Sequence, residues 1–345
     1  VHDVSLLAEV CIETALARCA VRLAPRFGRP VGQHSGQPQQ LIVLAMGKLG
    51  AGELNLSSDI DLIFVYPEPG KTEGGRRSVS NEQYFIKLGQ ALISALDQIT
   101  VDGFVFRVDM RLRPYGDSGA LVHNFVALEE YYEEQGRDWE RYALIKARPV
   151  TGDPGACRKL MAGLRPFIYR RYIDYGVIES LRGMKQMINA EVRRRGLQGN
   201  VKLGHGGIRE VEFIAQCLQL IRGGRDLGLQ QRELLPVLAE CARLGSLPAG
   251  AARELREAYL FLRDSEHAIQ GYRDRQTQEL PGDETAQLAL ATVMGFPGWE
   301  QYLEALEAHR TCVAGHFREL IADPEEEPVE EVAELPPWDE SLGED

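Results

Sequence analysis

Cysteine is sparse in this chain and falls into no binding pattern. The 345 residues contain six cysteines, with no C-x-x-C pair and no His/Cys cluster at zinc-ligand spacing. The pattern therefore indicates neither a disulfide framework nor a structural zinc site, and we interpret the cysteines as reduced, mostly buried thiols. A chain of this length can bury a large core without such staples, and the length suits two domains.

Long apolar runs are also missing. Nowhere do eighteen apolar residues follow one another, which argues against a membrane-spanning helix. Residues 1–7 lack the charged and apolar regions of a signal peptide, so we expect a cytoplasmic protein with no membrane partner. The sequence begins without Met and enters a helical pattern almost at once, and we therefore expect it to be a piece of a longer polypeptide.

Positive charge is in short supply. The net charge is −12, but residues 325–345 hold ten Asp or Glu and no Lys or Arg, so the remainder carries only −2. Nonspecific nucleic-acid binding requires a strongly basic face, and a nearly neutral body argues against nucleic acid as a partner. The acidic end, residues 323–345, is typical of a solvated tail or linker.

The first 150 residues mix helices with strands. Apolar residues at spacings of three and four predict a helix over 4–23, and a capping pattern at Ser80 opens a second helix that extends to about Gln98. Short apolar runs bounded by turn residues predict three strands. These strands cover Leu41–Ala45, Asp61–Tyr66 and Gly103–Asp109, and a loop rich in Gly, Pro and Gln occupies 28–39.

Beyond Gly155 the apolar pattern is almost wholly helical, with breaks at glycines and at Pro281-Gly282. We therefore predict a domain with a mixed sheet and an N-terminal helix over 1–150, and an all-helical domain over 151–322. The fold class that this pattern indicates is α+β.

Two carboxylates lie two residues apart at the start of a strand. Residues i and i+2 of a strand share a face, so Asp59 and Asp61 in SSDIDLIF project to the same side. A third carboxylate, Asp109, ends the FVFRVDM strand. If the strands are neighbours, three hard oxygen donors converge where they can hold Mg²⁺ or Mn²⁺.

An isolated D-x-D on a strand is more often a solvated edge than a metal site. Here the four residues after Asp61 are all apolar, which indicates a strand buried on both faces. Carboxylates next to such a strand need either an open sheet end or a cation. The context therefore favours a catalytic metal site formed by Asp59, Asp61 and Asp109.

Glycines and cations surround these carboxylates in the sequence. In GKLGAGELNLSS the glycines allow backbone N–H groups to approach a phosphate closely, and Arg and Lys side chains at alternate positions can hold phosphate oxygens. An ordinary Arg/carboxylate network is an equally good interpretation of any single cation. The candidate phosphate or nucleotide ligands are Gly47, Lys48, Gly50, Ser57, Ser58, Arg111, Arg113, Lys146 and Arg148.

A second glycine-rich segment, KLGHGGIREVEF, precedes a helix. Its geometry suits anion binding at a helix N-terminus, although a plain helix start explains it better from spacing alone. Its polar residues Arg209, Glu210 and Glu212 are weaker candidates for the same site.

Several stretches together resemble a known enzyme family. The G-x-x-G…D-x-D pattern resembles the DNA-polymerase-β-like nucleotidyltransferases. The segments AMGKLGAGELNLSSDIDLIFVYPE, FRVDMRLRPYGDSGAL, GRDWERYALIKAR, RPFIYRRYIDYGVIESLRGMK and KLGHGGIREVEFIAQCLQLIRGG are similar to the bifunctional glutamine synthetase adenylyltransferase/adenylyl-removing enzymes. They cover roughly residues 40–230, and the match is closer to the amino-terminal, adenylyl-removing half.

The resemblance implies a nucleotidyltransferase fold and a specific reaction. In the family, inorganic phosphate attacks the AMP-tyrosine linkage on glutamine synthetase and yields ADP and free tyrosine. The resemblance implies the same here, with Asp59, Asp61 and Asp109 as metal-binding carboxylates. It also implies three partners: glutamine synthetase as protein substrate, the PII signal protein, and a carboxy-terminal adenylyltransferase half of the same polypeptide.

Three other functions stay open at this stage. The reverse reaction, transfer of AMP from ATP to glutamine synthetase, can use the same site architecture. A noncatalytic module that docks glutamine synthetase or PII is disfavoured, because such a module has no reason to bury carboxylates on a strand. A transferase acting on RNA or a small nucleotide is disfavoured by the charge balance.

Overall fold

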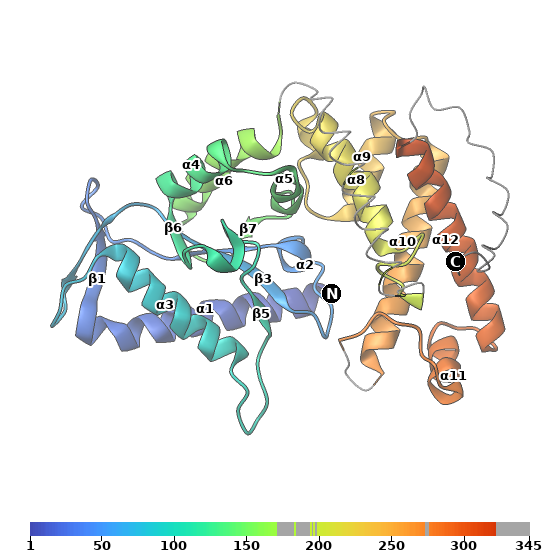
Figure 1. Ribbon diagram of the computed structural model, residues 1–345, viewed down its shortest axis with the longest axis horizontal. Helices are drawn as coiled ribbons and strands as arrows, with labels where there is room; N and C mark the ends of the chain where they lie inside the picture. Colours follow the sequence, from blue (N-terminus) through green and yellow to red (C-terminus); the bar gives the residue numbers. More distant parts are fainter. Residues whose placement is uncertain (171–182, 184–193, 195, 197–198, 273–275, 322–345) are drawn as a thin grey trace, which may run out of the picture.

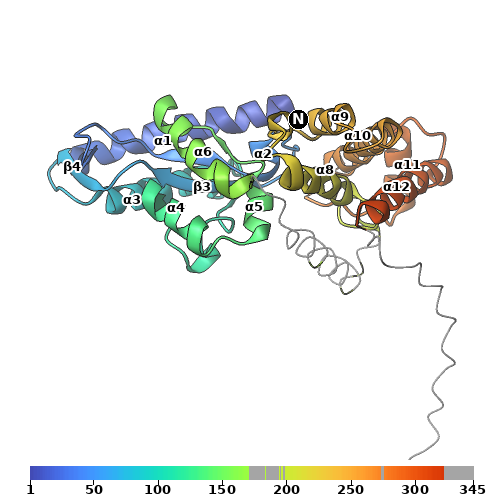
Figure 2. The same ribbon diagram turned by 90° about the horizontal axis from the view of Figure 1, so that it is seen from above.

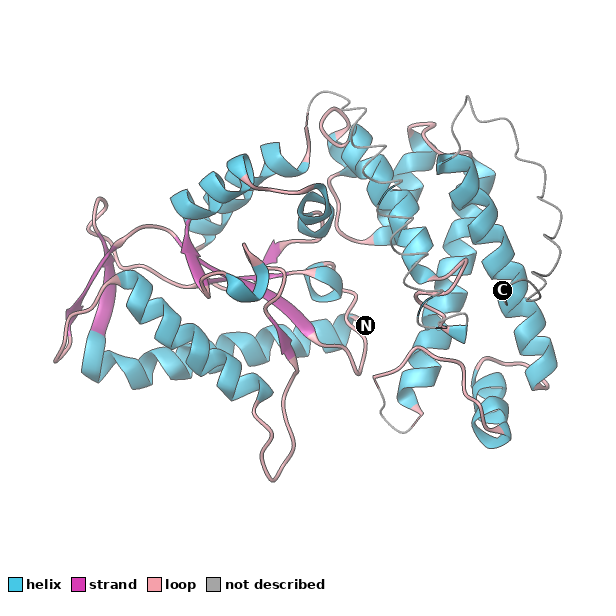
Figure 3. Cartoon of the chain, viewed as in Figure 1, coloured by secondary structure: helices cyan, strands magenta, loops and turns pink. Residues whose placement is uncertain are grey.

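The computed structural model describes residues 1–170, 183, 194, 196, 199–272 and 276–321. An α/β half and a helical half lie side by side, and all strands of these described residues belong to the first (Figures 1 and 3). The fold class expected from the sequence is confirmed: a mixed sheet with helices is followed by a helical region. In the described part of the chain, no helix is long and apolar enough to cross a bilayer.

The main sheet is built around β3, Ile60–Tyr66. The strand order is β5-β3-β2-β7, and β6 also pairs with β3. β2 is antiparallel to both β3 and β7, whereas β5 and β6 run parallel to β3. The partner strands are β2 (Ile42–Ala45), β5 (Val108–Asp109), β6 (Val122–Asn124) and β7 (Arg148–Pro149).

Both faces of β3 are buried, as its apolar run predicts. Leu62 and Phe64 point into a core formed with α1 (His2–Phe27) and α3 (Asn81–Asp97), which pack together. Ile63 and Val65 point into a second core that is shared with the helical half. Since alternate residues share a face, Asp61 lies on the same face as Ile63, toward the helical half.

Three further helices of the first half follow. They are α2 (Gly47–Gly50), α4 (Phe125–Glu134) and α5 (Asp138–Leu144), with a 3-10 turn η1 at Gly116–Ser118. Of these, α4 and α5 contribute to the second core. The next helix, α6 (Pro154–Ile168), packs against α4 and α5.

Within the described residues, the helical half contains α8 (Ile208–Arg222), α9 (Leu234–Arg243), α10 (Ala249–Gly271), α11 (Glu284–Val293) and α12 (Trp299–Ile321), with a 3-10 turn η3 at Leu227–Leu229. Its two longest helices, α10 and α12, pack against each other, and α8 and α9 pack on α10. Figure 2 shows these helices grouped at one end of the molecule, beyond α2 and α5.

Most predicted elements of the first half are present. The helix expected at 4–23 is α1, the strands expected at 41–45 and 61–66 are β2 and β3, and the second predicted helix is α3. Ser80 is the N-cap of α3, and its side chain accepts a hydrogen bond from the Gln83 N–H.

The third predicted strand is wrong over most of its length. Only Val108–Asp109 is β-structure, because Val105 and Phe106 donate their N–H groups to the Leu96 carbonyl at the end of α3. The loop expected at 28–39 is also partly wrong: Gly28–Gly32 forms β1, which pairs antiparallel with β4, Gly70–Gly74.

Candidate functional site

The carboxyl residues singled out from the sequence lie on adjacent parallel strands. Asp61 on β3 stands directly opposite Asp109 on β5 in the register of the pair. Asp59 lies two residues before Asp61, and both line one cavity. The expected neighbourhood of the strands therefore holds, and it places all three carboxylates at one end of the sheet.

Asp61 has the least favourable electrostatic environment of the three. Burial, then the charges of Asp59 and Asp109, raise the pKa of Asp61 to about 7. Neighbouring like charges disfavour the ionised form of a carboxyl group, and so does burial. A divalent ion held beside Asp61 would offset both effects and favour its ionised form.

Asp109 is already engaged by a cation. The Arg111 Nε lies 2.9 Å from Asp109 Oδ2 and 3.1 Å from its Oδ1, and these hydrogen bonds lower the Asp109 pKa. The three carboxylates do not form a closed cage in this conformation. Among the described residues, only Glu254, Cys312 and His316, between α10 and α12, bring their possible ligand atoms all within 4.8 Å of one another.

The short helix α2 lies close to the Asp61 carboxylate. Gly47 has φ of 51°, and a Cβ there would lie 2.8 Å from Asp61 Oδ2. At Gly50 a Cβ would lie only 2.0 Å from the Lys146 carbonyl oxygen. Both glycines are thus required by close approach, the first to Asp61 and the second to the segment before β7.

A cavity of about 510 Å³ contains the candidate site. Its walls come from the carboxylate end of the sheet, from α2 and α5, and from the start of α8. The lining residues are Gly47, Lys48, Ser58, Asp59, Asp61, Arg111, Leu112, Trp139, Tyr142, Ala143, Lys146, Lys202, Arg209, Glu212, Phe213 and Gln216. The cavity thus combines acidic, basic and aromatic side chains from both halves.

Two lysines predicted to bind phosphate are held in buried ion pairs. Lys48 Nζ lies 2.7 Å and 2.9 Å from the two carboxylate oxygens of Glu266 on α10. Lys146 Nζ lies 2.7 Å from Glu212 Oε1 and 3.6 Å from Glu53 Oε2. Burial lowers the Lys48 pKa to about 8 despite the Glu266 charge.

Arg113 and Arg148 do not reach the carboxylates. Arg113 folds back on its own turn, where Nη1 donates to the Met110 carbonyl at 2.8 Å. Arg148 Nη2 lies 2.6 Å from Glu9 Oε1 on α1, and its Nε donates to the Gly50 carbonyl. The spacing of two between Lys146 and Arg148 does not bring them to one pocket, because Lys146 lies in the turn before β7 and the alternation of a strand does not extend to it.

The remaining sequence candidates divide in the same way. Ser58 and Glu212 line the cavity. Ser57 is buried outside the cavity lining, and its carbonyl accepts a hydrogen bond from Arg107 Nη2 at 2.9 Å. Glu210 accepts from the Gly206 N–H at 3.1 Å, so it orders the loop before α8.

Several lining residues were not singled out from the sequence. Lys202 and Gln216 come from the helical half, and Trp139 and Tyr142 come from α5. Gln276 Nε2 also lies 3.3 Å from Asp59 Oδ1. The segment KLGHGG offered a signal for Lys202, but nothing local links Gln276 to a carboxylate more than two hundred residues away.

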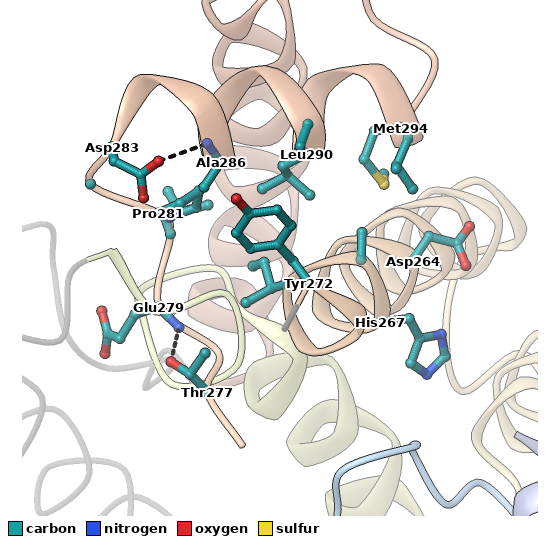
Figure 4. A pocket seen from close by; sticks show the side chains of 17 residues that line it. Asp264, His267, Tyr272, Thr277, Glu279, Pro281, Asp283, Ala286, Leu290 and Met294 are labelled. Atoms are coloured by element: carbon teal, nitrogen blue, oxygen red, sulfur yellow. Dashed lines mark hydrogen bonds between the residues drawn. The ribbon is translucent and has the colours of Figure 1, made fainter. Parts of the chain in front are cut away.

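A larger cavity, of about 840 Å³, lies in the helical half between α10 and α11. Its polar side chains serve local structure: Asp283 accepts from the Ala286 N–H as the N-cap of α11, and Thr277 accepts from the Glu279 N–H. The Tyr272 ring points from the end of α10 toward α11 (Figure 4). Because the polar groups of this larger cavity do not converge, the smaller cavity is the better candidate site.

Comparison with known proteins places both halves of the chain. The profile of the family described as glutamate-ammonia ligase adenylyltransferase matches residues 1–162. The profile of the family described as GlnD PII-uridylyltransferase matches residues 182–321. Bifunctional glutamine synthetase adenylyltransferase/adenylyl-removing enzymes match along the whole length of this chain. The chain is a homologue of these enzymes.

The identities to the bifunctional enzymes are high. The Pseudomonas aeruginosa enzyme is 58% identical over 351 residues, which cover 100% of this chain and 36% of that protein. The enzyme of Pseudomonas syringae pv. tomato is 56% identical with the same coverage, and that of Hahella chejuensis is 58% identical over 95% of the chain and 34% of its own length. The chain thus spans about a third of the curated relatives that it matches.

Proposed function

We propose that this chain removes AMP from an adenylylated tyrosine of glutamine synthetase by phosphorolysis, releasing ADP and the unmodified protein. The observation that carries the proposal is the pair Asp61 and Asp109, opposite each other on parallel strands, with Asp59 and Asp61 lining one cavity. Three carboxylates at one end of a sheet suit a nucleotidyl-transfer site that handles charged phosphates.

A divalent cation fits the donors in this cavity. Asp59, Asp61 and Asp109 offer hard oxygen ligands, and the pKa of Asp61 is raised by burial and then by the charges of Asp59 and Asp109, which a cation would counteract. Mg²⁺ or Mn²⁺ held there would stabilise charge on the phosphoryl oxygens and on the departing tyrosinate. For Asp109 to join such a set, its carboxylate has to exchange the Arg111 guanidinium for the ion.

The protein's own groups have few tasks in this reaction. Inorganic phosphate is already partly dianionic near neutral pH, so the attacking oxygen needs no strong general base. It forms a bond to the phosphorus of AMP while the bond to the tyrosine oxygen breaks, and the tyrosinate then takes up a proton. Arg and Lys side chains of the cavity hold the phosphates, and the aromatic groups of α5 exclude water.

The partners follow from the same proposal. Glutamine synthetase is the protein substrate, and the carboxy-terminal adenylyltransferase half is the remainder of the polypeptide. The helical half matches a family whose description names PII, and on that ground we propose that PII acts on this chain through its helical half.

The decisive test uses Asp61→Asn. We expect the wild-type chain, incubated with adenylylated glutamine synthetase, phosphate and Mg²⁺, to release ADP. The Asp61→Asn variant should lose roughly a hundredfold or more of this rate, because one charged ligand is gone. ADP is measured by chromatography, and circular dichroism checks that the variant stays folded.

Asp102→Asn is the matched control. Asp102 lies exposed at the tip of the loop before β5, outside the cavity lining, and its variant should keep the wild-type rate. A chelator should abolish ADP release by the wild-type chain and by the Asp102→Asn variant. The proposal fails if the wild-type chain releases no ADP under these conditions, and release of pyrophosphate from ATP with unmodified glutamine synthetase would favour the reverse activity.

A further inference from the structure

Five cationic side chains line the candidate cavity, and they differ in what they already bind. They are Lys48, Arg111, Lys146, Lys202 and Arg209. The first three are held by carboxylates in the folded protein, namely Glu266, Asp109 and Glu212 respectively. Each of these three positive charges is therefore already matched by a negative one.

The two buried lysines are poorly suited to take up an incoming anion. The Glu266 side chain is fully buried, and the Lys48 and Lys146 side chains are only 13% and 9% exposed. Withdrawing such a lysine from its partner leaves a buried carboxylate uncompensated, which costs several kcal/mol. We therefore assign both lysines to holding the two halves together.

Lys202 and Arg209 are in a different situation. Lys202 is partly exposed and Arg209 is exposed, both line the cavity, and neither makes an ion pair within the described part of the chain. They lie on the wall that the helical half contributes, whereas the carboxylates lie on the wall from the sheet. The positive charge of Lys202 still acts on Asp61, where it partly opposes the rise of the Asp61 pKa.

The backbone that carries both cations is fixed from several sides. The Lys202 N–H donates to Asn200 Oδ1 at 3.0 Å, and its carbonyl accepts from the Arg209 N–H at 3.1 Å. Arg310 on α12 donates to the Asn200 carbonyl at 2.9 Å. Gly206 has φ of 66°, and a Cβ there would lie 2.1 Å from the Arg310 carbonyl oxygen. Two available cations, Lys202 on this loop and Arg209 in the first turn of α8, form a site with little left to organise.

We propose that Lys202 and Arg209 bind the inorganic phosphate that enters the reaction, on the opposite side of the cavity from the three carboxylates. The inference rests on the proposed function and adds to it the location of the second substrate. It assigns the phosphate to the helical half, so that AMP and phosphate are held by different halves of the molecule. A lysine and an arginine that line the same cavity can share the oxygens of one dianion.

The test separates phosphate binding from the rest of the reaction. Initial rates of ADP release are measured against phosphate concentration, at constant ionic strength, for Lys202→Gln, Arg209→Gln and the double variant. Each single variant should raise the phosphate KM about tenfold, because a charge-assisted contact is lost. The KM for adenylylated glutamine synthetase and the rate at saturating phosphate should stay close to wild type.

Two further variants sharpen the result. Lys202→Arg keeps the charge and should hold the phosphate KM within about threefold of wild type, which a steric effect would not do. Lys159→Gln, an exposed lysine of α6 outside the cavity, removes a charge elsewhere and should change nothing. Should the double variant fold poorly, the two single variants carry the test.

The outcomes distinguish the two proposals. A wild-type chain that releases ADP while the variants keep the wild-type phosphate KM would overturn the phosphate site and leave the proposed function standing. A chain with no phosphate-dependent release of ADP would overturn the function itself. Equal rises in KM for both substrates would place Lys202 and Arg209 in general electrostatic attraction and would contradict a phosphate subsite.

Discussion

The pair Lys146 and Glu212 shows how burial changes the role of a charged residue. Both were candidates for the active site on sequence grounds, and in the fold they bind each other 2.7 Å apart across the cavity wall. Burial opposes ionisation of Glu212, but Lys146 outweighs it and lowers the Glu212 pKa to about 2. The pair therefore stabilises the fold only while Glu212 is charged.

This pair predicts an acid-sensitive contribution to stability. Because the Glu212 pKa falls from 4.5 in the unfolded chain to about 2 in the fold, its contribution is complete above pH 4.5 and is lost as the pH falls toward 2. At most about 3 kcal/mol is at stake. In Glu212→Gln we expect a lower unfolding free energy at pH 7 and a shallower loss between pH 4.5 and 2, measured by urea unfolding.

The control for this prediction is Glu304→Gln, at an exposed position of α12. Its unfolding free energy should follow the wild-type pH dependence. Identical pH slopes for Glu212→Gln and wild type would show that the ion pair contributes nothing to acid sensitivity.

At the scale of elements, the short helix α2 can pack closely against its neighbours because Gly47 and Gly50 carry no side chains. Gly50 lies where the chain before β7 crosses α2, and a Cβ there would meet two backbone carbonyls, at 2.0 Å and 2.6 Å. Neither carbonyl can move without disturbing β2 or the segment before β7. The same packing holds Gly47 against Asp61.

We therefore expect Gly50→Ala to destabilise the protein by about 2 kcal/mol or more, as overpacking of a rigid site does. Gly250→Ala is the matched control, because Gly250 lies in α10 with open space around its Cβ position. That change should leave stability equal or raise it by up to about 1 kcal/mol, through helix propensity. Denaturant midpoints of the two variants provide the comparison, and equal midpoints would refute the crossing argument.

At the scale of the whole molecule, the helical half holds the loop that leads to the acidic strand. Arg263 on α10 donates to the Glu53 carbonyl at 2.8 Å, and His267 Nε2 lies 3.0 Å from Asn55 Oδ1. One apolar core also runs from β2 and β3 into α8, α10 and α12. The proposed division into domains at residue 150 stays a prediction, and α6, just after that point, packs on α4 of the first half.

A shared core and buried ion pairs predict that both halves unfold together. Of the three tryptophans, Trp139 lies on α5 and Trp299 on α12, while Trp338 lies outside the described residues. Trp299→Phe/Trp338→Phe leaves only the first reporter, and Trp139→Phe/Trp338→Phe leaves only the second. Fluorescence during urea unfolding should give coincident midpoints after correction for each variant's overall stability by circular dichroism. Two separated transitions would show that the halves are independent units.

The elements were predictable wherever the sequence pattern is local. Burial of β3 on both faces follows from its continuous apolar run, and the start of α3 follows from the cap at Ser80. The antiparallel pair of β1 and β4 was missed because Gly-rich strands carry no alternating pattern. Only two residues of the strand expected over 103–109 form a strand, because the N–H groups of Val105 and Phe106 are hydrogen-bonded to the end of α3. The segment RRYIDYGVIESLRGMK lies almost wholly outside the described residues.

The sequence by itself predicted that Asp59 and Asp61 project to one side, because alternation along a strand is a property of the backbone; both line one cavity, although Asp59 lies just before β3. It also pointed to Asp109, because a carboxylate at the end of a predicted strand can be recognised from the sequence alone. Only the tertiary structure decided which cations face them. Lys48 and its partner Glu266 are 218 positions apart, and Lys202 reaches the cavity from the helical half. Such pairings depend on long-range packing, which no local spacing encodes.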